Sequence, residues 1–242
     1  MKRKAFLIGS PMEVGTKNFL PGVTPDIINM KRILHSNTGG AWDYNEIKVF
    51  ENPTREELYE KMSREYDFVI VQYSGHGFEY SRSGTTLDIN PYESITLKEI
   101  HGITKCPKRY YFLDSCRGIV PEELNKNLKF FSMMESARED IRKAYRNKYE
   151  NVIEQCENGN SIIYSCGLNE SADEDPDGLG GIFSLSYFRT ADAIDNIPMN
   201  EYYSIQDVFN LAVEKMKEDY YLSDQNPMMK PERRNHYFPF LI

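Results

Sequence analysis

The chain has 242 residues, a formal net charge of −8 at pH 7 and an isoelectric point near 5.2. An acidic chain lacks the concentrated Lys and Arg face that nucleic-acid phosphates require, so we expect no nucleic-acid partner. No apolar run is long enough to span a membrane, so no membrane partner is expected either. The length suits one α/β domain with a substantial core, which we expect over residues 1–242.

The start of the chain and its cysteines bear on where the protein works. The start is basic, but the apolar run at 5–9 is too short for the core of a signal peptide. Without an export signal, the cysteines are expected to be reduced thiols in a cytoplasmic protein. They lie in or beside predicted elements, at Cys106, Cys116, Cys156 and Cys166.

The first elements alternate between short apolar runs and helical patterns. The patterns predict strands at 4–9 and 45–50 and helices at 24–36 and 54–66. Thr54 and Glu57 have the spacing of a capping box, which marks the start of the second helix.

Two further apolar runs end abruptly in small polar turns. The run at 67–73 stops at Ser74-Gly75-His76-Gly77, and the run at 109–113 stops at Asp114-Ser115-Cys116-Arg117-Gly118. Their length and their β-branched and aromatic residues favour strands buried on two faces, as in a parallel sheet covered by helices. Because the carboxyl ends of such strands line the ligand crevice, His76 and Cys116 could be neighbours although they are distant in the chain.

The remaining elements complete the same pattern. Residues 78–100 have no helical period and predict a small hairpin, then a short helix from about Thr96, walling one side of the cleft. Residues 122–158 are charge-rich, with an apolar stripe that predicts a surface helix packed on the sheet. A fifth strand, two helices and a buried apolar tail are predicted at 161–166, 182–193, 204–220 and 236–241.

The two turn motifs together resemble the histidine and cysteine motifs of caspase-like cysteine proteases. Caspases carry a Gln-Ala-Cys-Arg-Gly type signature, with the histidine about fifty residues upstream. Asp114 stands where that Gln would be, which is more similar to metacaspases and bacterial caspase homologues. The resemblance covers nearly the whole chain, and residues 236–241 resemble the last strand of the family. It implies a caspase-like α/β fold with a largely parallel six-stranded sheet and helices on both faces.

The resemblance also implies a cysteine endopeptidase with a catalytic dyad. Cys116 would attack the scissile carbonyl and His76 would protonate the leaving amine. The backbone N–H groups of Gly77 and Cys116 would face the oxyanion, and a glycine at position 77 leaves that approach open. Taken singly, Cys116 could be a buried small hydrophobe and His76 a hydrogen-bonded turn residue. Their pairing within two matching turns favours catalysis.

Specificity follows from residues that match the substrate pocket of metacaspases. Asp114 and Ser74, each two positions before a dyad member, match a carboxylate and a polar member of that pocket. Asp26 matches a second acid near the start of the first helix, although Val23 replaces a cysteine of the family. Two carboxylates around a narrow slot would bind Arg in bidentate fashion or Lys as a point charge, which predicts cleavage after Arg or Lys in a protein or peptide substrate. Asp26 could instead be an exposed acid favoured by the helix dipole, and Asp114 a structural turn acid.

Residues 122–158 allow a second interpretation. Caspase-like enzymes are often cut between the cysteine half and the carboxyl-terminal half, so this stretch could be an activation segment that the enzyme processes itself. The basic residues that offer cut positions are Lys126, Lys129, Arg138, Arg142 and Arg146.

The loop at 167–181 is acidic, and residues 173–178 have the D-x-D-x-D-G spacing that opens a calcium-binding loop. It departs from an EF-hand because position twelve is Ser184 rather than Glu and because Pro176 restricts the turn. We expect it instead, with Glu170, to form a rim that attracts basic substrates. No metal site and no required cofactor are predicted, while activation by Ca²⁺ stays open because some metacaspases need it.

Two other functions stay open. A catalytically idle scaffold could keep this fold to bind partners, although the presence of both dyad residues argues against it. An enzyme that cuts after Asp would need a basic pocket, for which Arg82 and Arg189 are candidates without a motif to place them. A regulatory protein partner also stays open.

The other histidines share no metal-ligand spacing and are expected to be structural: His35, His101 and His236.

Overall fold

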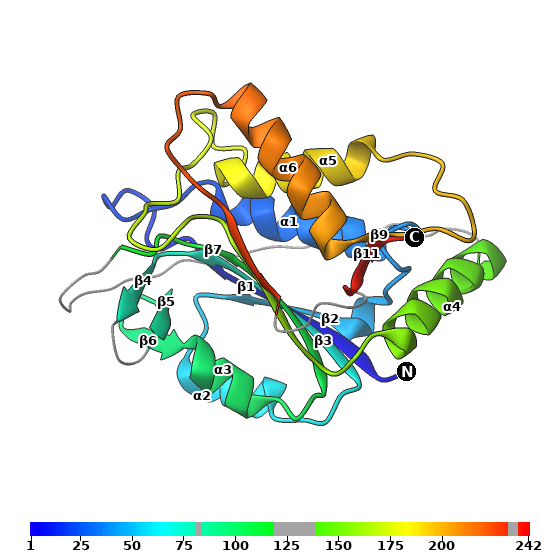
Figure 1. Cartoon of the computed structure of the whole chain (residues 1–242). Helices are drawn as coiled ribbons and strands as arrows, with labels where there is room; N and C mark the ends of the chain where they lie inside the picture. The colour runs from blue at the N-terminus through cyan, green and yellow to red at the C-terminus, as the bar shows by residue number, and fades with distance from the viewer. Residues whose placement is uncertain (81–83, 119–138, 232–236) are drawn as a thin grey trace.

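The computed structural model describes residues 1–80, 84–118, 139–231 and 237–242. Its central sheet contains six strands: β1 (Arg3–Ser10), β2 (Ile47–Glu51), β3 (Phe68–Gly75), β7 (Lys108–Asp114), β8 (Gly159–Tyr164) and β10 (Met228–Pro231). They lie in the order β10-β8-β7-β3-β1-β2, and only the pairing of β10 with β8 is antiparallel. Figure 1 shows this sheet running through the middle of the molecule. The predicted α/β fold with a largely parallel six-stranded sheet is confirmed.

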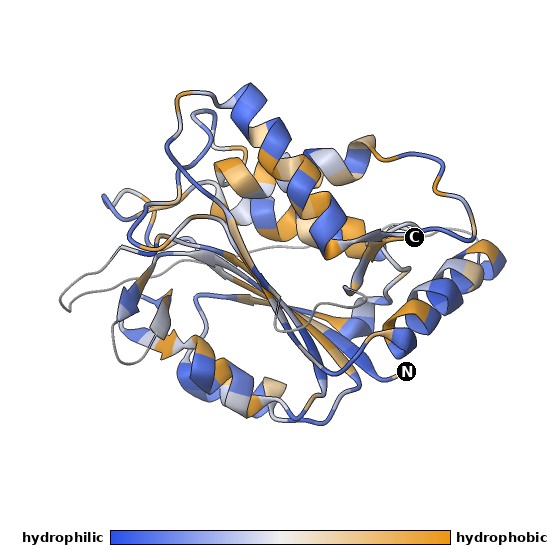
Figure 2. Ribbon diagram, in the orientation of Figure 1, coloured by the Kyte–Doolittle hydropathy of each residue, from blue (hydrophilic) through white to orange (hydrophobic). Residues whose placement is uncertain are grey.

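Helices cover both faces of the sheet (Figure 1). One face packs against α1 (Val23–His35), α4 (Glu139–Gln155), α5 (Ile182–Ala193) and α6 (Ile205–Asp219), and the other against α2 (Arg55–Met62) and α3 (Leu97–Ile103). Successive strand residues point to opposite faces, so Leu7 enters the first core and its neighbour Ile8 the second. Figure 2 shows α4 and α6 with both hydrophobic and hydrophilic residues, as expected of helices with one buried side.

The helix α2 begins where its predicted cap places it but ends earlier than predicted. The Thr54 side chain accepts a hydrogen bond from the Glu57 N–H at 3.1 Å, and α2 begins at the next residue. The helix ends at Met62, short of the predicted 66, because the Tyr66 N–H donates to the Lys105 carbonyl at 3.0 Å instead of continuing the helix. Before β2, residues Tyr44–Glu46 form a short 3₁₀ helix, η1.

Residues 77–96 form more than the single hairpin predicted. They make a separate three-stranded antiparallel sheet of β4 (Gly77–Tyr80), β5 (Gly84–Asn90) and β6 (Glu93–Thr96). The short helix α3 follows directly, and its capping box joins Thr96 to Glu99. Since β4 begins one residue after His76, this small sheet is continuous with the histidine turn.

The carboxyl-terminal run does not supply the sixth strand of the main sheet, as its resemblance to the family's last strand implied. That place belongs to β10, and the tail forms β11 (Pro239–Leu241), which pairs with β9 (Tyr203–Ser204) in a separate two-stranded sheet. The physical reason is burial: the side chains of the tail complete the core beneath α4 and α6, as predicted for so apolar a run. The buried tail residues are Phe238, Phe240, Leu241 and Ile242.

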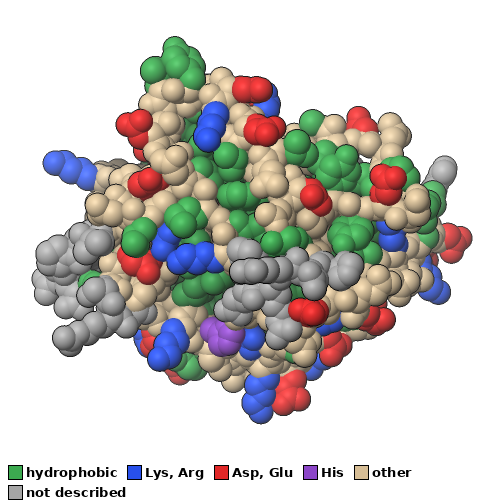
Figure 3. Space-filling view, viewed as in Figure 1, with side chains coloured by type: hydrophobic (Ala, Val, Ile, Leu, Met, Phe, Trp, Pro, Cys, Tyr) green, Lys and Arg blue, Asp and Glu red, His purple; other side chains and the backbone are tan. Residues whose placement is uncertain are grey.

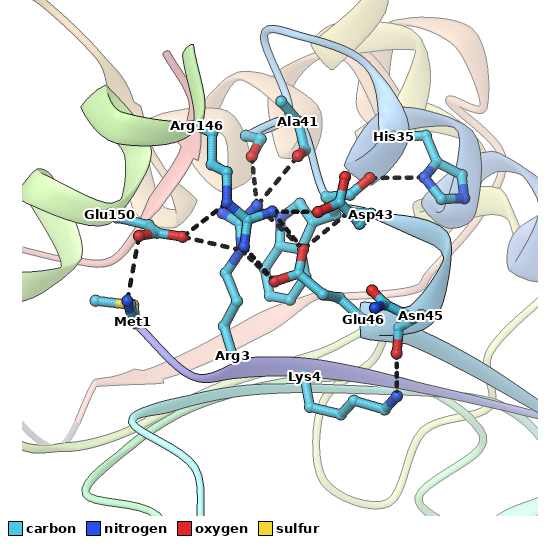
Figure 4. Close-up of polar contacts among 12 residues, drawn as sticks. Met1, Arg3, Lys4, His35, Ala41, Asp43, Asn45, Glu46, Arg146 and Glu150 are labelled. Atoms are coloured by element: carbon cyan, nitrogen blue, oxygen red, sulfur yellow. Dashed lines mark hydrogen bonds and ion pairs between the residues drawn. The ribbon is translucent and has the colours of Figure 1, made fainter. Parts of the chain in front are cut away.

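The helix α4 is tied to the start of the chain by charged side chains (Figure 4). Arg146 forms ion pairs with Glu46 and Glu150, and the fully buried Arg3 side chain pairs with the same two carboxylates. Arg3 also stacks over the Trp42 ring at 4.4 Å. Of the predicted cut positions, Arg142 and Arg146 therefore lie inside a helix with their guanidinium groups engaged. The others, Lys126, Lys129 and Arg138, lie outside the described residues.

Charged side chains of both signs are spread among hydrophobic ones on the face seen in Figure 3. Within the described part of the chain, no helix combines the length and the apolar character needed to cross a membrane.

Candidate active site

His76 and Cys116 follow neighbouring strands of the central sheet. His76 comes directly after β3, and Cys116 lies two residues beyond the end of β7. The two strands are parallel, and Ser74 is in register with Asp114. His76 and Cys116 each follow that register pair by two positions, so both lie at the carboxyl edge of the sheet.

The segments that carry the two residues are in direct contact. A Cβ atom added to Gly77 would lie 2.8 Å from the Ser115 hydroxyl oxygen, so only glycine allows this approach. Two residues on, the Glu79 N–H donates to the Gly118 carbonyl at 3.2 Å. The cysteine turn therefore lies against the start of β4.

The Cys116 thiol is held by the loop at 167–181, which we call the acidic loop. The backbone N–H of Ala172 lies 3.4 Å from the Cys116 sulfur. Burial raises the pKa of the thiol, while the hydrogen bond to the Ala172 backbone opposes this and the nearby Asp114 carboxylate adds to it. This environment therefore favours the protonated thiol over the thiolate. All four cysteines are free, and each of them lies in the described part of the chain.

His76 is oriented by a backbone carbonyl. Its Nε2 lies 2.7 Å from the Asn18 carbonyl oxygen, in the loop after β1. A carbonyl can only accept, so Nε2 carries the hydrogen and donates it. In the neutral ring the lone pair is then on Nδ1, which is the atom left to exchange a proton with a nucleophile. Among the described residues, His76 is thus hydrogen-bonded to Asn18 and Cys116 to Ala172 in this conformation.

The three residues predicted to form the substrate pocket come together. The Ser74 hydroxyl donates to Asp26 Oδ2 at 2.7 Å, and the Gly181 N–H donates to both Asp26 oxygens at 3.2 and 3.3 Å. A Cβ atom added to Gly181 would lie 2.2 Å from Asp114 Oδ2, so both carboxyl groups approach this one glycine. Asp26 is 1% exposed and Asp114 5% exposed, which excludes the alternative that Asp26 is an exposed first-turn acid.

Burial raises the pKa of both carboxyl groups. For Asp26 the largest cause is desolvation and the next is the charge of Asp114, while hydrogen bonds from Ser74 and Gly181 favour the ionised form. For Asp114 desolvation again dominates, opposed by hydrogen bonds from Ser184 and Ser165. Two carboxyl groups this close and this buried disfavour simultaneous ionisation, and a cation between them would relieve that cost.

The acidic loop is less of an open rim than predicted. Glu174 is half-buried and accepts a hydrogen bond from the Gly22 N–H at 2.8 Å. Asp175 is buried and accepts a hydrogen bond from the Tyr220 hydroxyl at 2.6 Å, so its carboxylate stabilises the loop instead of facing solvent.

Arg189, a candidate for a pocket that binds Asp, lies near Asp175 and Tyr220, while Arg82 is outside the described residues. No group of three or more His, Cys, Asp or Glu side chains among the described residues is arranged to hold a metal ion.

Two of the other histidines have hydrogen-bonding neighbours. His35 Nδ1 lies 2.9 Å from the Trp42 carbonyl oxygen, and His101 Nδ1 lies 3.3 Å from the Tyr111 hydroxyl. His236 lies outside the described residues.

Two residues of the site were not predicted as site residues from the sequence. Ser184, in the first turn of α5, donates its hydroxyl to Asp114 Oδ2, and Gly181 separates the two carboxyl groups. Neither belongs to a recognisable local motif, because their relation to Asp114 depends on how α5 docks on the sheet. The only signal was their position at the start of a predicted helix.

A largely parallel sheet covered by helices, with a cysteine and a histidine at its carboxyl edge, is the arrangement of a caspase-like peptidase domain. The family model for the caspase domain matches residues 2–238, and the chain belongs to that family. The family assignment indicates a hydrolase of the cysteine-peptidase type that acts on proteins.

Solved structures share the fold at low sequence identity. Caspase-1 from Spodoptera frugiperda is 13% identical and superposes with a TM-score of 0.53, over 95% of this chain and 86% of that one. A protein from Geobacter sulfurreducens is also 13% identical, with a TM-score of 0.61 over 99% of this chain and 100% of that one. None of the curated proteins compared with this chain matches it.

Proposed function

We propose that this protein is a cysteine endopeptidase that hydrolyses peptide bonds after Arg or Lys. The observation that carries the proposal is the convergence of Asp26, Ser74 and Asp114 on Gly181, with Asp114 two residues from Cys116. A pair of buried carboxyl groups beside a thiol suits a cationic side chain before the scissile bond and opposes an anionic one. The free state of all four cysteines fits a reducing compartment, which we propose to be the cytoplasm.

In the proposed reaction, the Cys116 sulfur forms a bond to the scissile carbonyl carbon and the amine leaves. His76 takes the thiol proton at Nδ1 and passes it to the leaving amine, with Asn18 holding the ring in the required tautomer. The backbone N–H groups of Gly77 and Cys116 stabilise the oxyanion. Water then releases the acyl group from the sulfur.

The contacts at the site suit a resting form of such an enzyme. Ala172 lies against the sulfur, and Gly180 and Gly181 pack on the Asp26 and Asp114 carboxyl groups. A substrate side chain reaches these carboxyl groups only when the acidic loop moves. Binding of Ca²⁺, a cut outside the described residues or a regulatory partner is the proposed trigger, and each would act by displacing this loop.

The test is a peptidase assay with fluorogenic peptides that end in Arg, Lys or Asp, with and without Ca²⁺. We expect cleavage after Arg and Lys, none after Asp, and none with the Cys116→Ala variant. Cleavage after Asp would refute the acidic pocket. Absence of cleavage under every condition would favour a non-catalytic scaffold.

A pocket variant separates specificity from chemistry. Asp26→Asn keeps the size of the side chain and its hydrogen-bond acceptor but removes the charge. We expect kcat/KM for Arg and Lys peptides to fall about 30-fold or more, the loss typical of a buried charge pair that loses one partner. The rate at which iodoacetamide alkylates Cys116 should stay within about twofold of wild type, since the thiol itself is untouched.

A further inference from the structure

We propose that Arg117 and Glu79 are positioning residues, whose ion pair holds the cysteine turn (residues 115–118) against the histidine turn and β4 (residues 76–80). The inference deepens the proposed function and rests on it, because it concerns the geometry of the same dyad. It assigns a role to two residues that belong neither to the proposed substrate pocket nor to the dyad.

Arg117 is a buried charge immediately after the nucleophile. Its side chain is 1% exposed, and its Nη2 lies 3.2 Å from Glu79 Oε2. The central carbon of the guanidinium lies over the Tyr164 ring, 3.9 Å from the centroid. Arg117 is thus fixed from two sides, by a carboxylate from β4 and by a ring at the end of β8.

Glu79 lies three residues after His76 and makes two bonds to the cysteine turn. Its backbone N–H donates to the Gly118 carbonyl at 3.2 Å, and its side chain pairs with Arg117. The Thr85 hydroxyl, from β5, donates to the same Glu79 oxygen at 2.9 Å. One side-chain bond and one main-chain bond therefore join the segments that carry the cysteine and the histidine.

Stability alone is a poor reason for this ion pair. Burying a guanidinium has a desolvation cost that the partner carboxylate often only offsets. The pairing is also incomplete, because Arg117 Nε is buried without a hydrogen-bond partner. A buried charge retained at this cost next to the nucleophile is better explained by the geometry it imposes on the turn.

The test measures the dyad without a substrate. On the full chain, the rate of Cys116 alkylation by iodoacetamide is followed from about pH 5 to about pH 10, with the modified residue identified by mass spectrometry. Glu79→Gln removes the carboxylate at constant size. Thr85→Val is the matched control, since it removes the other contact to Glu79 and leaves the ion pair. His76→Ala is the reference for a thiol without its imidazole.

We expect His76→Ala to move the alkylation midpoint to higher pH, because an imidazolium beside the sulfur favours the thiolate. Glu79→Gln should move it in the same direction and lower kcat by about tenfold to a hundredfold with KM within about twofold, as expected for a misplaced catalytic group. Glu79→Asp, which restores the charge, should recover part of the loss. Thr85→Val should leave the midpoint in place.

The outcomes separate the two proposals. An unchanged midpoint in His76→Ala would refute the dyad, and the positioning role with it. A shift in His76→Ala with none in Glu79→Gln would overturn the positioning role alone. An equal shift in Thr85→Val would also overturn it, because general loosening of the small sheet would then explain the effect.

Discussion

The backbone N–H of Ala172 lies 3.4 Å from the sulfur of Cys116, so the resting thiol is held by the acidic loop. This contact joins a residue after β7 to one after β8, two strands that are neighbours in the sheet. In the proposed reaction, a substrate peptide would have to displace this loop to reach the sulfur. Thiol reactivity is therefore a direct measure of whether the loop is closed.

The four cysteines should differ in reactivity. Burial raises the pKa of Cys156 to about 11 and that of Cys166 to about 12, and each thiol is at most 4% exposed. Cys106 is also buried, whereas Cys116 is partly exposed. We expect iodoacetamide to modify Cys116 first by at least about tenfold, since thiolate fraction and access govern the rate. Peptide mass spectrometry of briefly treated protein checks this, and equally rapid modification of Cys166 would contradict the closed core.

The buried carboxyl groups of Asp26 and Asp114 should lower the free energy of unfolding as pH rises. A carboxyl group whose pKa is raised by folding binds more protons in the folded state, so its contribution is present below its unfolded pKa near 3.9 and is lost as pH climbs through the folded value. Burial and the charge of Asp114 raise the pKa of Asp26 well above its usual range. Asp26→Asn should therefore raise the free energy of unfolding relative to wild type, and by more at about pH 8 than at about pH 5.

Urea unfolding at both pH values measures this difference. The control is Asp192→Asn, which removes a half-exposed carboxylate paired with Arg32 and should change stability by less than about 1 kcal/mol. If Asp26→Asn raised the free energy of unfolding by the same amount at both pH values, the pKa of Asp26 would not be raised by folding as described.

Substitution by alanine should have opposite effects on stability at two glycines. At Gly181 the new Cβ would lie 2.2 Å from Asp114 Oδ2, so Gly181→Ala should destabilise the fold by about 1–3 kcal/mol, as overpacking does. At Gly102, inside α3, the added Cβ would have no heavy atom within 4 Å among the described residues, apart from its chain neighbours and the backbone of its own helix. Gly102→Ala should stabilise by about 0.5–1 kcal/mol through helix propensity. Thermal unfolding of the two variants measures this difference. Equal changes in melting temperature would contradict the prediction.

Removing a buried arginine should destabilise the fold more than removing an exposed one. Arg3→Met leaves Glu46 and Glu150 with a lost partner in a mostly buried site, and should cost about 3–5 kcal/mol. Arg32→Met removes an ion pair in which both side chains are 49% exposed, and should cost less than about 1 kcal/mol. Chemical denaturation of both variants checks this. A small loss for Arg3→Met would mean that Arg146 compensates for it.

Local sequence signals located most elements. Apolar runs gave the strands before His76 and Cys116, and the Thr54 cap marked the start of α2. The turn motifs that end two parallel strands also indicated that His76 and Cys116 share an edge. These features depend on neighbours within a few positions, which is why composition and spacing suffice to predict them.

Other features depend on contacts between distant parts of the chain. The tail left the main sheet because its apolar residues complete a core between helices, while β10 pairs at the edge. The approach of Asp26 and Asp114 to Gly181 is likewise set by the docking of α1 and α5 on the sheet.

The sequence by itself determined the alternation of strands and helices and the residue types at the carboxyl edge of the sheet. Only the tertiary structure decided that Asp26 is buried, that Ala172 holds the Cys116 sulfur and that Asn18 orients His76. The reason is that burial and hydrogen bonding between residues far apart in the chain arise from packing, which no local pattern encodes.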